Sequence, residues 1–285
     1  MKLNGRRESS NYEDRRGSNG KKIAGFGGAG AIIVALLALF LGGNPSEVLQ
    51  QLGSGTVQQS GEYTPTEQEE QLKTFALQIL ASTEDVWTAE FKKLGRTYRA
   101  PKLVIYTDAV QSGCGNATSA VGPFYCSADE CVYLDLGFFD EMPKSLGAGG
   151  DFAYAYVIAH EVGHHVEHLL GTLDDAHAKM ARQGEVEKNK TSVRIELLAD
   201  YYAGVWGFHE NRMFGSIEDG DLQEAIDAAQ KIGDDYLQRR ARGSVSPESF
   251  THGTSAQRMR WLKQGLQSGD IRGGEKLLTA DYNAL

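Results

Sequence analysis

The segment HEVGH at residues 160–164 restricts the fold of this 285-residue chain more than any other feature of its sequence. In an α-helix, residues four positions apart differ by about 40° in azimuth, so His160 and His164 would project from one face and could share a metal ion. We expect a helix that presents both imidazoles, with Glu161 beside them, and buries its other side in a core. The apolar stripe on that side consists of Ile158, Val162, Val166 and Leu169.

A catalytic zinc site needs a third protein ligand and an open position for water. The metzincin arrangement is excluded, because it would need Gly and His at the positions of Glu167 and Leu170. His165 is turned away from His164 by about 100°, and His168 lies one turn beyond it, so we interpret both as residues at the rim of the site or supporting it.

The third ligand is expected from the helical run IELLAD at residues 195–200, which places Glu196 and Asp200 on one face. We predict that His160, His164 and Glu196 bind one Zn²⁺ per chain. Asp200 would accept the other ring N–H of a ligand histidine and so fix its tautomer. The alternative is that Glu196 and Asp200 are two solvated carboxylates of a surface helix.

Near the N-terminus, nineteen consecutive residues from Ile23 to Leu41 are all Ile, Ala, Gly, Phe, Val or Leu. As a helix this run would span roughly 28 Å, close to the hydrocarbon thickness of a bilayer at about 30 Å. We predict a retained single-span membrane anchor over residues 23–42, with a cleaved signal peptide and a buried core helix as alternatives. The basic residues before it predict a cytoplasmic N-terminus and an extracytoplasmic domain, which would be periplasmic in a Gram-negative bacterium.

The net charge of −9 is unevenly distributed. Residues 1–22 hold seven Lys and Arg against three acidic residues, which is +4 and leaves −13 for the remainder. An acidic body without a basic stripe argues against nucleic acid as a partner, because neutralising phosphates requires clustered Lys and Arg. The expected partners are a protein or peptide substrate and the lipid bilayer.

The fold class expected from the patterning is α+β, with a few strands followed by a helical half. Short strands are predicted at 102–106 and 132–136, and helices at about 66–94, 151–170, 191–211, 221–241 and 254–267. We divide the chain into a basic cytoplasmic tail (1–22), an anchor (23–42), a linker rich in Gly, Gln, Ser, Thr and Pro (43–65) and a metallopeptidase domain (66–285).

The chain has three cysteines, an odd number for an extracytoplasmic domain. Cys114 and Cys126 flank a Gly-rich loop and could form a disulfide across it, which would leave Cys131 as a spare thiol. The alternative is three unpaired thiols. No Cys-x-x-Cys pair is present, which argues against a cysteine zinc knuckle.

His160-Glu161-x-x-His164 with Glu196-x-x-x-Asp200 resembles the gluzincin arrangement of thermolysin-like peptidases. More closely, the chain resembles the bacterial neutral zinc metallopeptidase family named for the YpfJ-type membrane proteins. The family often has Gln at the position of Leu198 and Cys at that of Tyr201, and Cys131 looks extra. The matching segments include GRRESSNYEDRRG, CGNATSAVGPFYC, VYLDLGFF, AHEVGHHVEHLLG, ELLADYYAGVW and HGTSAQRMRW.

The resemblance implies a mostly helical, zincin-like domain with a small sheet and zinc-dependent hydrolysis of peptide bonds. Glu161 would be the general base that takes a proton from a zinc-activated water. The alternative function is a zinc-binding, catalytically weak envelope assembly or chaperone-like factor. The presence of Glu161 argues against it, because binding zinc alone does not require a base.

The segment THGTSAQR at 251–258 is similar to the C-terminal motif of membrane zinc endopeptidases of the CAAX-processing type, in which a His and an Arg approach the metal. By that similarity His252 and Arg258 would be catalytic residues that stabilise the oxyanion of the tetrahedral intermediate. The alternative is a capped helix start with an exposed His252 and an ion-paired Arg258, because Ser and Thr are ordinary N-cap residues.

Overall fold

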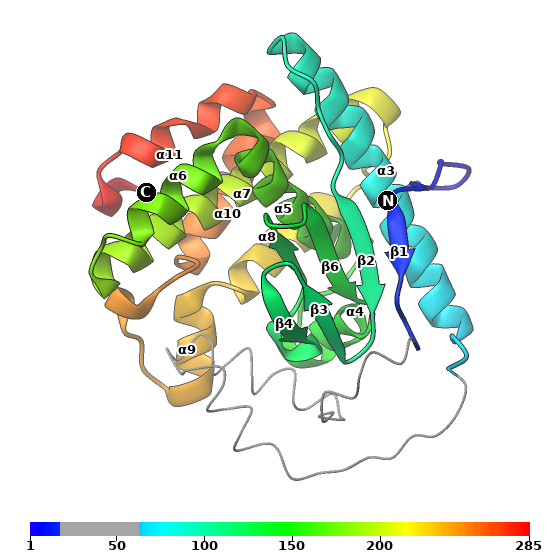
Figure 1. The fold of residues 1–285 in the computed structure, drawn as a ribbon, viewed down its shortest axis with the longest axis horizontal. Helices are drawn as coiled ribbons and strands as arrows, with labels where there is room; N and C mark the ends of the chain where they lie inside the picture. The colour runs from blue at the N-terminus through cyan, green and yellow to red at the C-terminus, as the bar shows by residue number, and fades with distance from the viewer. Residues whose placement is uncertain (18–62) are drawn as a thin grey trace.

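The computed structural model describes residues 1–17 and 63–285, which form a mostly helical α+β fold with a small sheet (Figure 1). The strands are β1 (Tyr12–Asp14), β2 (Lys102–Tyr106), β3 (Ala109–Ser112), β4 (Gly115–Thr118), β5 (Phe124–Cys126) and β6 (Cys131–Asp135). The helices are α3 (Glu67–Lys93), α4 (Gly137–Glu141), α5 (Asp151–Leu170), α6 (Thr172–Met180), α7 (Glu185–Phe214), α8 (Asp221–Lys231), α9 (Asp234–Arg242), α10 (Ser255–Ser268) and α11 (Lys276–Thr279).

The main sheet has the strand order β1-β2-β6-β5, in which β5 is antiparallel to β6 and the other pairs are parallel. Because side chains alternate across a strand, β2 and β6 contribute to two apolar clusters. Leu103, Ile105, Val132 and Leu134 join the main core with the helices, and Val104 and Tyr133 belong to a smaller cluster with the β3–β4 hairpin. The predicted strand at 102–106 matches β2, and the one at 132–136 lies one residue earlier as β6.

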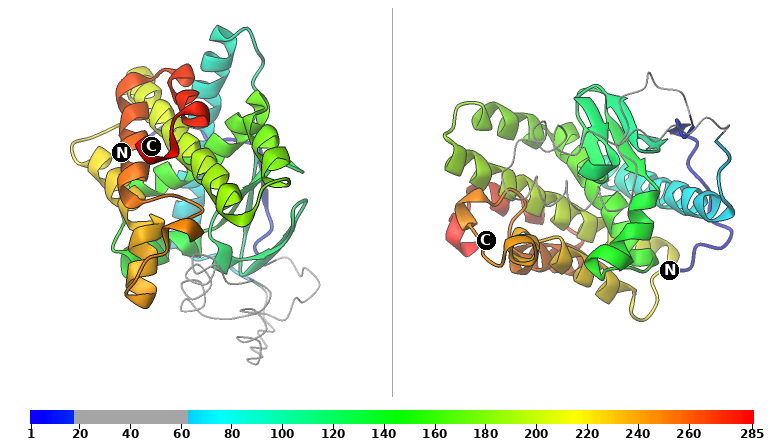
Figure 2. Two further views of the ribbon diagram at one scale, coloured as in Figure 1. Left: turned by 90° about the vertical axis from the view of Figure 1, so that its left-hand side faces the viewer. Right: turned by 90° about the horizontal axis from the view of Figure 1, so that it is seen from below.

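Helices α5, α7 and α10 form the centre of the helical half, and α6, α8, α9 and α11 pack around them (Figure 2). The predicted helices at 151–170 and 254–267 match α5 and α10 within a residue, whereas α7 is longer at both ends than expected. Helices α7 and α10 pack closely because glycines face each other at their contact. A Cβ on Gly265 would lie 2.1 Å from the carbonyl oxygen of Tyr201, so only glycine fits there.

The single helix predicted at 221–241 is wrong, because the chain breaks between α8 and α9. At the break, Gly233 lies against the start of α10: a Cβ on it would be 2.3 Å from the backbone nitrogen of Ser255. The carboxylate of Asp235, the second residue of α9, accepts a hydrogen bond from that same Ser255 N–H at 2.7 Å. The break therefore joins α9 to the N-terminus of α10.

Residues 1–17, predicted to be a separate cytoplasmic tail, pack against the rest of the described chain. Strand β1 pairs with β2 in the sheet, and Leu3 is buried in the main core. Arg6 forms an ion pair with the fully buried Glu210 at 2.8 Å. The domain boundary at residue 66 is therefore corrected: the fold also includes the N-terminal segment, in which Arg6, Arg7 and Arg16 have acidic partners in residues 63–285.

The predicted anchor at 23–42 and most of the predicted linker lie outside the described residues. Within residues 1–17 and 63–285, no helix is both long enough and apolar enough to cross a bilayer.

Candidate metal centre

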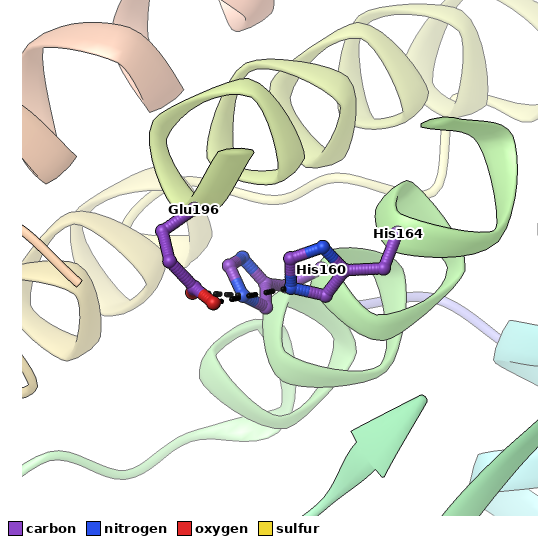
Figure 3. A group of neighbouring side chains, drawn as sticks. All are labelled: His160, His164 and Glu196. Atoms are coloured by element: carbon purple, nitrogen blue, oxygen red, sulfur yellow. Dashed lines mark hydrogen bonds and ion pairs between the residues drawn. The ribbon is translucent and has the colours of Figure 1, made fainter. Parts of the chain in front are cut away.

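The crossing of α5 over α7 brings the predicted metal ligands together. The helices touch at Gly163 and Ala199, where a Cβ on Gly163 would lie 2.9 Å from the Ala199 carbonyl oxygen. Gly163 lies between the two predicted ligand histidines of α5, and Ala199 follows Glu196 on α7. The side chains of His160, His164 and Glu196 consequently point toward one another across the crossing (Figure 3).

The spacing of these three side chains fits a zinc ion. His160 Nε2 is 3.2 Å from Glu196 Oε2, and His164 Nε2 is 3.6 Å from Glu196 Oε1. All three candidate ligand atoms lie within 4.8 Å of one another. Zinc bonds of about 2.0–2.2 Å in tetrahedral geometry place ligand atoms roughly 3–4 Å apart. The group is therefore a candidate His-His-Glu metal site.

Each histidine of the group has a carboxylate on its other ring nitrogen. His160 Nδ1 lies 2.8 Å from Asp200 Oδ1, and His164 Nδ1 lies 2.9 Å from Glu167 Oε2. A proton held on Nδ1 by a carboxylate leaves Nε2 with the lone pair that binds a metal. Asp200 has the position predicted for it. Glu167 was not predicted, although its place one turn after His164 is a signal that sequence reasoning could have used.

Asp200 is completely buried and is the centre of a hydrogen-bonded network. Besides His160, it accepts a hydrogen bond from the Tyr156 hydroxyl at 2.6 Å. Arg258 donates two more, from Nε at 2.8 Å and from Nη2 at 2.9 Å. Such a bidentate pair fixes both partners and compensates two buried charges. Tyr156, one turn before His160 on the same helix face, is a further residue that sequence reasoning missed.

These contacts differ from the predicted role of Arg258. It lines the cavity beside the metal-binding group, but its two closest contacts go to Asp200 and it is only 2 % exposed. The geometry therefore makes Arg258 a positioning residue, which holds the carboxylate that orients His160. The alternative of an ion-paired arginine in a capped helix is closer to what is found, since Thr254 and Gln257 form a capping box at the start of α10.

His252 lies in the loop between α9 and α10 and lines the same cavity. Asp234, at the start of α9, accepts hydrogen bonds from the backbone N–H groups of His252 and Gly253 at 2.7 and 2.9 Å. A carboxylate oxygen of Asp234 also lies 3.4 Å from His252 Nδ1. Asp234 was not identified from the sequence, because only the break before α9 brings it to this loop.

The charges of the group perturb one another strongly in the absence of metal. Burial lowers the pKa of His160, but the carboxylates of Asp200 and Glu196 outweigh burial and raise it to about 10. Burial raises the pKa of Glu196, but His252, His164 and His160 outweigh it and hold that pKa well below its usual range. The carboxylate of Glu196 is thus ionised, as a metal ligand must be.

Glu161 differs from the other carboxylates of the site. It is 8 % exposed, it lines the cavity, and its side chain makes no hydrogen bond to any residue in the described part of the chain. Burial raises its pKa above the usual value. Buried carboxylates with a structural role are normally hydrogen-bonded. A buried, unpartnered carboxylate beside a metal-binding group is the arrangement expected of a proton acceptor.

The cavity next to the group has a volume of about 510 Å³ and a mainly apolar lining. It is bounded by the segment that leads into β5, by α5, by α9 and by the loop that carries His252. Its volume lies in the range of about 300–1,000 Å³ that is common for ligand sites. The metal-binding group, Glu161 and His252 therefore all border one space that could hold part of a substrate.

The structure places the remaining predicted residues away from the chemistry. Cys114 and Cys126 are paired in a disulfide, and Cys131 is a buried free thiol. His165 is fully buried, with Nε2 2.6 Å from the carbonyl oxygen of Arg99 and Nδ1 2.9 Å from the hydroxyl of Tyr125. His165 thus joins α5 to β5 and does not face the metal-binding group.

Comparison with known proteins agrees with this site. YpfJ, an uncharacterized protein of Escherichia coli strain K12, is 47% identical over 279 residues, which is 95% of this chain and 96% of YpfJ. Uncharacterized proteins of Mycobacterium bovis and Mycobacterium tuberculosis are each 40% identical over 199 residues, 66% of this chain and 65% of theirs. No solved structure matches the chain. The family described as "Putative neutral zinc metallopeptidase" matches residues 1–276, and the chain therefore belongs to that family.

Proposed function

We propose that this protein is a zinc-dependent endopeptidase with His160, His164 and Glu196 as zinc ligands and Glu161 as general base. The observation that carries the proposal is the unpartnered carboxylate of Glu161, buried beside the three ligands at the edge of a substrate-sized cavity. A protein that only binds zinc has no need of this group. The same observation argues against the alternative of a catalytically weak assembly factor.

Zinc, when bound, supplies Lewis acidity toward water and toward the carbonyl of the scissile bond. Glu161 accepts a proton from the attacking water and later delivers it to the leaving amine. His252, held by Asp234, donates a hydrogen bond to the developing oxyanion. Burial lowers the pKa of His252, but Glu196 and Asp234 outweigh burial and raise it above its ordinary value.

The test is hydrolysis of unfolded casein by the full-length protein, with zinc content measured in parallel. Wild type should cleave casein, lose activity with a chelator and regain it with zinc. Glu161→Gln should keep its zinc and its fold while losing nearly all turnover, because an amide cannot accept the proton. Comparable cleavage by wild type and Glu161→Gln would exclude Glu161 as the base.

Membrane attachment through residues 23–42 stays a prediction, whereas a cytoplasmic N-terminus combined with an extracytoplasmic domain conflicts with the fold of the described residues. The orientation was predicted from the basic residues before the apolar run, and several of these have partners in the domain: Arg6 with Glu210, and Arg16 with Glu70 at 2.6 Å. Pairing of β1 with β2 also requires residues 12–14 and 102–106 to lie on the same side of any membrane. We therefore propose that both flanks of the apolar run share one compartment.

A further inference from the structure

One wall of the cavity is formed by α9, and it combines apolar and cationic side chains. Leu237 and Arg240 both line the cavity and are three residues apart on the helix, so they are neighbours on one face. Phe124, Phe138 and Ile232 continue the apolar surface around them. A side chain bound here would meet apolar atoms and a guanidinium group side by side.

Among the charged residues of the cavity, only Glu161, the proposed base, and Arg240 lack a charged partner at ion-pair distance in the described part of the chain. His160, His164, Glu196, His252 and Arg258 all have charged partners within the site. Arg240 is exposed and its guanidinium interacts with the Tyr236 hydroxyl, but within residues 1–17 and 63–285 it has no carboxylate at ion-pair distance. A guanidinium without a carboxylate partner, at the edge of a cavity in an otherwise acidic protein, is suited to bind an anion from outside.

The position of Arg240 relative to the reacting centre follows from helix geometry. Asp234, at the first position of α9, holds His252 at the centre, and Arg240 lies six residues further along the helix. At 1.5 Å per residue this is about 9 Å along the axis. An extended peptide advances about 3.3 Å per residue. A peptide cleaved beside His252 and bound in an extended form along α9 would therefore reach Arg240 roughly two to three residues from the scissile bond.

We propose that Arg240 is a specificity-determining residue that binds a carboxylate of the substrate two to three residues from the scissile bond. The adjoining wall at Leu237 and Ile232 receives an apolar side chain next to that carboxylate. The substrate class is thus a peptide with an apolar residue beside an acidic one, or beside its own C-terminal carboxylate. This inference rests on the proposed peptidase function for its catalytic consequence, but not for binding.

The catalytic test compares Arg240→Glu with Arg239→Glu in the full-length protein. Arg239 is the exposed neighbour on α9 and does not line the cavity, so its substitution changes the net charge equally without touching the site. The substrates are fluorogenic peptides with one cleavable core and with Glu or Lys at the third residue on either side of the bond. A further pair ends two residues after the bond, as a free acid or as an amide.

Wild type should prefer a Glu peptide over its Lys counterpart, measured as the ratio of kcat/KM values. Arg240→Glu should lower that ratio by about 5–30-fold, because an attraction is replaced by a repulsion. Arg239→Glu should change it less than about 2-fold. A second outcome is that Arg240→Glu lowers only the preference for the free-acid peptide over the amide, without changing the preference for Glu over Lys. In that case the carboxylate that Arg240 binds is the C-terminal carboxylate of the peptide. Equal shifts in both variants, or no preference in wild type, would overturn the inference.

A binding measurement separates this inference from the proposed function. Fluorescence anisotropy of the same labelled peptides with Glu161→Gln requires no turnover. The Glu peptide should bind more tightly than the Lys peptide, and the preference should disappear in Glu161→Gln/Arg240→Glu. If this result is obtained while wild type cleaves no peptide, carboxylate binding stands and the peptidase proposal fails. If no peptide binds measurably, the inference is refuted.

Discussion

Replacing Asp200 by Asn tests the buried network that supports the metal-binding group. The substitution keeps the shape of the side chain and removes the charge that compensates Arg258, whose side chain is 3 % exposed. Leaving a buried charge without its partner costs about 3–5 kcal/mol. Because Asn can still accept one of the hydrogen bonds from Arg258, Tyr156 and His160, we expect a loss of about 3 kcal/mol in the free energy of unfolding.

The assay is urea unfolding followed by circular dichroism, with chelator present so that loss of metal does not contribute to the difference. Arg258→Met in the Asp200→Asn background serves as the matched control, since removing the unpaired charge should recover part of the loss. The pKa of Asp200 is lowered in the folded state, mainly by Arg258 and His160 against the effect of burial. The ionised Asp200 therefore contributes its full share to the free energy of unfolding above the unfolded pKa near 3.9. This stabilisation declines as the pH falls below that value, and the decline is expected in wild type and not in Asp200→Asn.

With zinc restored, Asp200→Asn should also bind the metal about 10–100-fold more weakly, because His160 loses the carboxylate that orients its ring. A variant within about 1 kcal/mol of wild type in stability would refute the reasoning about the buried pair. Equal losses in the free energy of unfolding from Arg258→Met in wild type and in the Asp200→Asn background would also refute it. The two residues would then be energetically uncoupled.

Further predictions concern the ligands, the helix crossing, the loop and the N-terminal segment. Glu196→Ala should lose most of its zinc in metal analysis, and full occupancy at wild-type affinity would remove Glu196 from the ligand set. Gly163→Ala should weaken zinc binding about 10-fold or more in a competition titration, because its Cβ would press on the Ala199 carbonyl and separate α5 from α7. His252→Ala should bind zinc normally but lose about 10²–10³-fold in kcat, the usual cost of one oxyanion donor, and an unchanged kcat with a lowered melting temperature would assign the loop to structure. Arg6→Ala should lower the free energy of unfolding by about 3 kcal/mol, because its partner Glu210 is fully buried. Arg7→Ala is the control and should cost less than about 1 kcal/mol, because its partners Glu84 and Asp85 lie nearer the surface. Tags before Met1 and after Leu285 should be equally accessible to protease in every cell fraction, and opposite accessibility would contradict the pairing of β1 with β2.

Local sequence patterns determined the parts of this protein that depend on short-range geometry. Helical spacing alone places His160 and His164 on one face of α5, and Glu196 and Asp200 on one face of α7, whatever the rest of the chain does. The strand at 102–106 and the ends of α5 followed for the same reason, because a run of β-branched and aromatic residues and a long helical period are local signals.

Only the tertiary structure decided which distant residues support Asp200 and the loop that carries His252. The pairing of Arg258 with Asp200 depends on the close contact of α7 with α10, and that of Asp234 with His252 depends on the break at Gly233. Neither contact has a periodic signature, because the partners are far apart in the chain. The N-terminal segment is the clearest case. Its basic residues, counted along the sequence, are typical of a cytoplasmic tail, and only the fold shows that Arg6, Arg7 and Arg16 pair with carboxylates of the domain.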